Sequence, residues 1–172
     1  MDDNQYKRIV SVLLVLSTVL LAVLIPGGPI ETRDFSHISP LVLGLFNSFL
    51  TILGMGGLVL VYFCWKYKHW AFYASLLCGT SYFFVYVLDL TGIFPTSPSA
   101  MPIALELIEY SGSIVSIPLM FYSLAAIKHR SRVAISIETG SGFDTRQVVV
   151  VVVFSIISVA IVTFATLAAM GK

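Results

Sequence analysis

The chain has 172 residues, of which 58% are hydrophobic and only 11% are charged, and its formal net charge is +1. Its mean hydropathy is +0.95. A soluble domain carries about 25% charged residues, and too few charges are present here to cover a surface that faces water. The composition therefore excludes a soluble globule, a disordered tail and a nucleic-acid-binding protein, and it favours a protein whose solvent is a lipid bilayer.

Five apolar runs are long enough to cross a hydrocarbon core, which takes roughly 20 helical residues. They span residues 9–25, 41–65, 70–94, 103–127 and 148–170. The runs are continuous rather than alternating, which favours helices over the strands of a membrane barrel. We predict an all-α integral membrane protein, a bundle of five transmembrane helices that forms one transmembrane domain over residues 1–172 without a soluble domain.

The Lys and Arg residues predict the orientation, because loops on the cytoplasmic side are enriched in them. Eight of the ten lie in segments that share one side of the membrane, and the other side holds only Arg33 and Lys172. We therefore expect a cytoplasmic N-terminus and a C-terminus outside. We expect a multi-pass protein of the plasma membrane, which in a bacterium is the cytoplasmic (inner) membrane.

The first apolar run has a second interpretation, as a cleaved signal peptide, because Lys7 and Arg8 precede it. A signal peptide ends in a cleavage site of small residues, and Ala22 is followed by larger ones. We expect the first helix to be retained.

Motifs for chemistry are missing. The three histidines, His37, His69 and His129, fall in predicted loops on both sides of the membrane, so they cannot form a pair of haem ligands within it. We found no phosphate-binding loop and no set of residues for nucleophilic catalysis. We expect no catalytic residue, no metal and no cofactor. The expected partners are the lipid bilayer and, as open alternatives, other membrane subunits or further copies of the chain, but no nucleic acid.

Acidic residues gather toward the predicted outer side. Tyr82, Tyr86 and Asp89 recur at helical spacing on the third run, and Glu106 and Glu109 fall in the first turns of the fourth. A guanidinium among these carboxylates is expected to pair with one or more of them. We predict an outward-facing ligand-binding pocket formed by Asp89, Glu109, Glu106, Arg33, Asn47, Tyr86 and Glu31.

Small residues predict which helices pack together, because they let helix backbones approach closely. The second, third and fourth runs each have a pair at spacing four: Gly44 and Ser48, Ser75 and Gly79, and Gly112 and Ser116. The first and fifth runs have only scattered Ser and Thr. We expect a core of the second, third and fourth helices, with the first and fifth facing lipid.

Three functions remain open. We favour a protein that binds or transports a small cation, a proton or an amphiphile through the acidic pocket. The first alternative is an accessory or assembly subunit of a larger membrane complex, without chemistry of its own. The second is a membrane-embedded enzyme in which Asp89 and Glu109 form a carboxylate dyad that works as general acid and base. Two carboxylates without a nucleophile or metal are a thin basis for catalysis, so we expect a protein that is not an enzyme.

Overall fold

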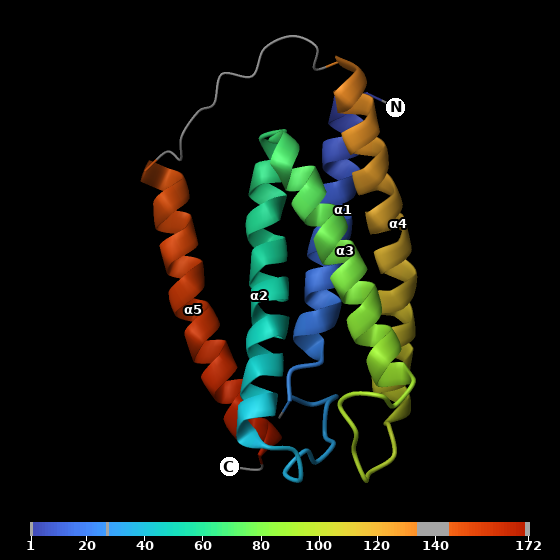
Figure 1. Ribbon diagram of the computed structural model, residues 1–172, viewed down its shortest axis with the longest axis vertical. Helices are drawn as coiled ribbons and strands as arrows, with labels where there is room; N and C mark the ends of the chain where they lie inside the picture. The colour runs from blue at the N-terminus through green and yellow to red at the C-terminus, as the bar shows by residue number, and fades with distance from the viewer. Residues whose placement is uncertain (1, 27, 134–144, 171–172) are drawn as a thin grey trace.

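The computed structural model describes residues 2–26, 28–133 and 145–170, and within these ranges it is a bundle of five helices (Figure 1). They are α1 (Asp3–Val23), α2 (Pro40–Trp65), α3 (His69–Leu90), α4 (Ile103–Val133) and α5 (Thr145–Ala169). Each contains a stretch long and apolar enough to cross a membrane. The helices run alternately up and down (Figure 1), so the α1–α2 loop, the α3–α4 loop and the end of α5 meet at one end of the bundle. We call this the Arg33 end.

Three helices extend at least three residues further at one end than hydropathy predicted, and one of them is α5, since it begins at Thr145 rather than residue 148. α1 begins at Asp3 rather than residue 9, because Asp2 and Gln5 form a capping box in which each side chain accepts a hydrogen bond from the other's backbone N–H. α4 continues to Val133 rather than residue 127, through a polar segment that the apolar run leaves out. Hydropathy marks where a helix is apolar, and at α1 the capping box sets where the helix begins.

α3, in contrast, ends at Leu90, four residues before the predicted end. Gly92 has a positive φ of 65°. The N–H of Gly92 donates to the carbonyl of Asp89, and the N–H of Ile93 donates to that of Leu88. This is the Schellman arrangement that closes a helix at a glycine. It places Asp89 in the last turn of α3, at the Arg33 end.

The first helix packs into the bundle with one face and exposes the other, so the prediction that left it outside the packed core was wrong. α1 packs against α2, α3 and α4. Its buried face consists of Val10, Ser11, Leu14, Ser17, Thr18 and Leu21. Half of these residues are Ser or Thr, which pack well between membrane helices because they are small. Within the described residues α2 and α4 do not contact each other, and α1 contacts both. The predicted core of the second to fourth helices must therefore be corrected to one that includes α1.

The small residues of α3 and α4 do mark a close helix contact, as predicted. A Cβ added at Gly79 would lie 3.0 Å from the side chain of Met120 and 3.1 Å from that of Leu119. A Cβ at Gly112 would overlap the ring of Tyr86. These two glycines let the backbones of α3 and α4 approach, and Tyr86 fills the space that Gly112 leaves.

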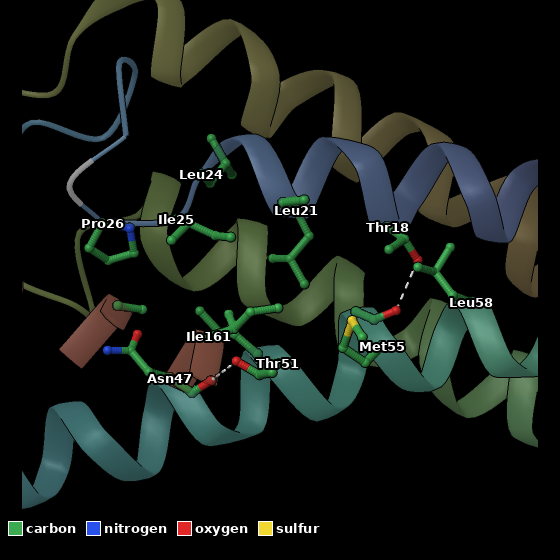
Figure 2. A pocket seen from close by; sticks show the side chains of 14 residues that line it. Thr18, Leu21, Leu24, Ile25, Pro26, Asn47, Thr51, Met55, Leu58 and Ile161 are labelled. Atoms are coloured by element: carbon green, nitrogen blue, oxygen red, sulfur yellow. Dashed lines mark hydrogen bonds between the residues drawn. The ribbon is translucent and has the colours of Figure 1, made fainter. Parts of the chain in front are cut away.

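α5 is peripheral, as expected for a helix facing lipid, and of the described helices it packs against α2. Only 11% of its apolar span is buried. Near its end, Thr166 accepts a hydrogen bond from Asn47 of α2 at 3.3 Å. Between α1, α2 and α5 lies a cavity of about 130 Å³ (Figure 2), which we call the apolar cavity. Its lining includes Leu21, Ile25, Met55, Leu58 and Ile161.

Candidate functional site

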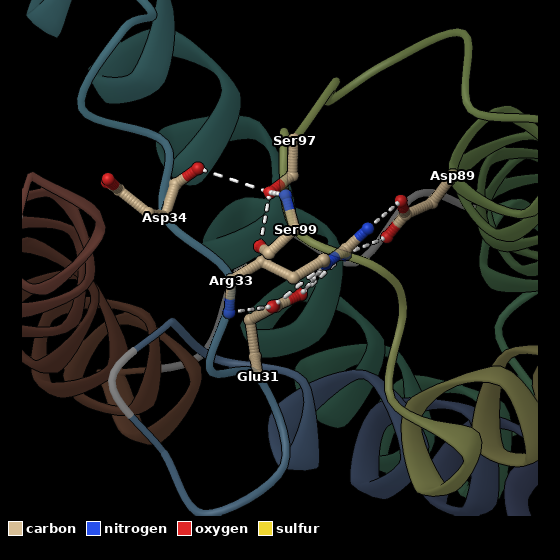
Figure 3. Close-up of polar contacts among 6 residues, drawn as sticks. All are labelled: Glu31, Arg33, Asp34, Asp89, Ser97 and Ser99. Carbon is tan, nitrogen blue, oxygen red and sulfur yellow. Dashed lines mark hydrogen bonds and ion pairs between the residues drawn. The ribbon is translucent and has the colours of Figure 1, made fainter.

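At the Arg33 end, Arg33 connects the α1–α2 loop to the last turn of α3 (Figure 3). Its Nη1 donates to Oδ1 of Asp89 at 2.8 Å and its Nη2 to Oδ2 at 2.7 Å. Its Nε donates to Oε1 of Glu31 at 3.0 Å, and Nη2 donates to Oε2 at 2.6 Å. The expected pairing of Arg33 with acidic residues is confirmed. We call Glu31, Arg33 and Asp89 the ion-pair cluster.

The ion-pair cluster is almost closed to solvent. The side chains of Arg33 and Glu31 are each 5% exposed, and that of Asp89 is 13% exposed. Burial alone would lower the pKa of Arg33, but the hydrogen bonds and charges of Asp89 and Glu31 outweigh burial and raise this pKa above its ordinary value. The guanidinium is therefore always charged, and its planar fork meets both carboxylates.

Local structure explains why these residues meet. The backbone N–H of Arg33 also donates to Oε1 of Glu31, two residues earlier, at 3.0 Å. This bond holds the Glu31 carboxylate beside Arg33, where it also accepts hydrogen bonds from the guanidinium. Asp89 lies at the negative end of the α3 dipole, where an anion is disfavoured unless a cation is near. Arg33 supplies that cation.

Further hydrogen bonds tie the α1–α2 loop to the α3–α4 loop (Figure 3). The hydroxyl of Ser97 donates to the backbone carbonyl of Asp34 at 3.3 Å and also contacts the hydroxyl of Ser99 at 2.8 Å. The N–H of Ser36 donates to Oδ1 of Asp34 at 2.8 Å, and this hydrogen bond lowers the pKa of the exposed carboxyl. The two loops thus form one layer over the end of the bundle.

Phe35 anchors the same loop on its other side. It is 2% exposed and packs with Leu43 of α2 and Ala169 of α5. The guanidinium carbon of Arg33 lies 5.2 Å from the centre of its ring, within the range of a cation–π contact. Arg33 is therefore held both by its two carboxylates and by a buried aromatic ring.

Beneath the ion-pair cluster lies a small cavity of about 40 Å³, which we call the acidic cavity. Five of the predicted site residues line it: Glu31, Asn47, Tyr86, Asp89 and Glu109. Glu109 comes from the second turn of α4 and is 1% exposed. Within the described residues, its Oε2 has no hydrogen-bond partner, and neither has the hydroxyl of Tyr86. Buried polar atoms normally have partners, so these two mark a place where a ligand or water fits.

The remaining predicted residues lie at the edge of this site. Glu106, one turn before Glu109, lines an open surface cleft of about 500 Å³ together with Arg33 and Asp89. It does not line the acidic cavity. Asp89 lines both the open cleft and the acidic cavity, and so lies between the cleft and the buried Glu109.

Sequence reasoning missed the contribution of α1 to the site. Leu21, Leu24 and Pro26 line both the acidic cavity and the apolar cavity. Leu21 and Leu24 were assigned to a helix facing lipid, and in a membrane an apolar residue gives no sign of whether it faces lipid or protein. The signal that could have placed α1 was its row of Ser and Thr, among them Thr18, whose hydroxyl contacts that of Tyr82 at 3.0 Å.

The described residues include no cluster of three or more His, Cys, Asp or Glu that could hold a metal ion.

The fold is that of a helical protein with five helices able to cross a membrane. Residues 6–138 match a family described as a domain of unknown function, DUF8051, and the chain belongs to that family. The match takes in nearly all of α1 to α4 and none of α5. No curated protein and no solved structure matches the chain.

Proposed function

We propose that this protein binds, and carries across a membrane, a small cation for which Glu109 provides the counter-charge in the acidic cavity. A proton is the smallest cation that would serve. The observation that supports this function is the contrast between Glu109 and the other two acids. Glu31 and Asp89 are bonded to Arg33 through both of their carboxylate oxygens. Glu109 is the most buried of the three and keeps one oxygen without a partner in the described structure.

A buried carboxylate is stable only when it is paired or protonated. Glu109 is hydrogen-bonded to the side chain of Asp89, and Asp89, Glu31 and Arg33 all interact electrostatically with it. Arg33 is already shared between two carboxylates, so the surroundings of Glu109 hold two anions and one cation. A cation entering the acidic cavity would balance this charge, whereas an anion would be repelled.

The cation counts support an orientation with the N-terminus in the cytoplasm and the Arg33 end outside. In that orientation the open cleft beside Arg33 and Glu106 faces the outside of the cell. The acidic cavity would then receive its ligand from the outer side, past the Arg33–Asp89 ion pair. We propose the plasma membrane, in a bacterium the cytoplasmic membrane, as the location.

The test compares two acids on the same helix. Methylammonium serves as the probe, and binding is measured as thermal stabilisation of the purified protein in detergent, which grows with the ratio of ligand concentration to Kd. Glu109→Gln should abolish the stabilisation, because it removes the counter-charge. Glu106→Gln, one turn away in the open cleft, should retain it. Stabilisation of Glu109→Gln equal to that of the wild type would refute the function.

The two alternatives from the sequence have their own tests. An accessory subunit should copurify with partner proteins in mild detergent, and recovery as a monomer alone would count against it. An enzyme with an Asp89–Glu109 dyad should show a bell-shaped pH–rate profile. Both oxygens of Asp89 accept hydrogen bonds from Arg33, so this carboxylate is already engaged in the ion-pair cluster, which favours the binding function.

A further inference from the structure

The acidic cavity and the apolar cavity are neighbours with a common wall. Asn47 and Leu50 of α2, and Leu21, Leu24 and Pro26 at the end of α1, line both of them. In Figure 2, Asn47 lies at the end of the apolar cavity nearest Pro26, and Leu58 lies at the opposite end. A ligand that reached past Asn47 would have one end beside a carboxyl group and the other in an apolar space.

The size of the acidic cavity limits the cationic group that fits it. A cavity needs roughly 10 to 15 Å³ on this measure to hold one water, so about 40 Å³ takes a group the size of a few waters. A primary ammonium group is of that size and offers three N–H donors. Glu109 Oε2 and the Tyr86 hydroxyl oxygen are two acceptors with no partner among the described residues. A quaternary ammonium is bulkier and has no N–H to donate.

The apolar cavity suits a hydrocarbon chain. The hydroxyls on its wall are already bonded inside the protein. Thr18 interacts with the carbonyl of Gly54 and with Tyr82, and Thr51 donates to the carbonyl of Asn47. The surface that remains is apolar. Dry cavities of about 150 Å³ in other proteins hold one benzene molecule, so this cavity of about 130 Å³ takes roughly six carbons.

We propose that the two cavities together bind a linear primary amine, with its ammonium group at Glu109 and its alkyl chain between α1, α2 and α5. This assignment rests on the proposed function, since the ammonium group is the cation that Glu109 receives. It adds the class of ligand, an amphiphile with one chain, and a second site that the cation alone does not need.

The experiment measures the affinity of methylammonium, n-hexylammonium and n-hexyltrimethylammonium for the wild type and for variants with a filled cavity. Gly54→Leu places a side chain in the apolar cavity, where a Cβ meets Leu21 and Thr18 at ordinary contact distances of 3.7 and 3.9 Å. Gly56→Leu is the matched control, since a Cβ there has nothing within 4 Å and Gly56 does not line the cavity. Ala22→Phe, at the exposed edge of the same cavity, replaces Gly54→Leu if that variant fails to fold.

Hexylammonium should bind the wild type on the order of 1000-fold more tightly than methylammonium, from roughly fourfold for each of the five added methylenes. Gly54→Leu should lose at least tenfold of this gain and leave methylammonium binding unchanged, while Gly56→Leu should behave as the wild type. Partition of the amine into detergent is the same for every variant, so the comparison between variants cancels it. Hexyltrimethylammonium should bind at least tenfold more weakly than hexylammonium.

Each contrary result removes a defined part of the inference. Equal binding of methylammonium and hexylammonium to the wild type, with both lost in Glu109→Gln, would overturn the chain site and leave the proposed function standing. The same loss in Gly54→Leu and Gly56→Leu would overturn the chain site as well. Hexylammonium binding that persists unchanged in Glu109→Gln would refute the ammonium site and the proposed function together. Equal binding of the quaternary amine would refute the preference for a primary ammonium.

Discussion

Replacing Arg33 by Met should destabilise the protein far more than replacing Asp89 by Asn. Arg33→Met leaves Glu31 and Asp89 buried beside each other with no cation, in a site where their side chains are 5% and 13% exposed. Removing one partner from a buried ion pair costs about 3 to 5 kcal/mol, and here one substitution strands two carboxylates. Asp89→Asn removes one charge and leaves Arg33 bonded to Glu31 at 2.6 Å, so we expect a cost of about 1 to 2 kcal/mol.

The charge balance also predicts how the two substitutions combine. With Asp89→Asn already present, Arg33→Met strands only Glu31, so the double variant should be more stable than Arg33→Met alone. Arg33→Lys is a useful intermediate, because it keeps the charge but loses the planar fork that reaches both carboxylates. It should fall between the wild type and Arg33→Met.

The assay is unfolding in mixed detergent micelles, followed by tryptophan fluorescence, with the four variants measured at one pH and ionic strength. Trp65 and Trp70 lie around the α2–α3 turn, away from the Arg33 end. They therefore report on unfolding of the bundle rather than on the substituted site. A loss below about 1 kcal/mol for Arg33→Met, or equal losses for Arg33→Met and Asp89→Asn, would refute the view that this buried guanidinium holds two carboxylates together.

Three further predictions use pairs of similar residues. Tyr82→Phe should cost about 1 to 2 kcal/mol in the same unfolding assay, because the Tyr82 hydroxyl donates to a backbone carbonyl of α2 at 3.1 Å. Tyr86→Phe should cost almost nothing, because the Tyr86 hydroxyl has no partner among the described residues. Equal costs for the two substitutions would contradict this prediction. Gly112→Ala should lower the midpoint of thermal unfolding, because its Cβ would overlap the Tyr86 ring, and Gly56→Ala should leave the midpoint unchanged or raise it, since open space surrounds it. Methylammonium binding should weaken as the pH falls, because a proton and an organic cation compete for the Glu109 carboxylate, and titration calorimetry at several pH values that found equal affinities would contradict this competition.

Hydropathy was sufficient to predict five apolar helices but not their arrangement. In a soluble protein the apolar face of a helix is the buried face, whereas a membrane helix is apolar all round because lipid is as apolar as the protein interior. α1 and α5 therefore looked alike in sequence. α1 packs against three other helices and buries Leu14 fully, whereas α5, among the described helices, packs only against α2. What separates them is the placement of small polar residues such as Ser17 and Thr18 on the packed face of α1.

The site was predictable where charge decided it and less so where packing did. Arg33 is one of the two cations on its side of the predicted topology, so its pairing with carboxylates follows from composition and loop assignment. Which acids it takes depends on the Schellman end of α3 and on the fold of the loop around Glu31. Neither can be read from hydropathy. The apolar cavity depends on how α5 meets α2, which has no counterpart in the sequence pattern.

Three carboxylates and one guanidinium in a poorly solvated place could serve either structure or function. The two roles can be told apart by whether each carboxylate oxygen has a hydrogen-bond partner. Asp89 and Glu31 have partners for both oxygens, and these bonds join two loops and a helix end, which is a structural role. Glu109 is more deeply buried, and its Oε2 contributes no hydrogen bond within the described structure. A buried polar atom without a partner costs stability, and such a cost is expected at a binding site rather than in a scaffold. Glu109, rather than Asp89, is therefore the carboxyl group on which the function should depend.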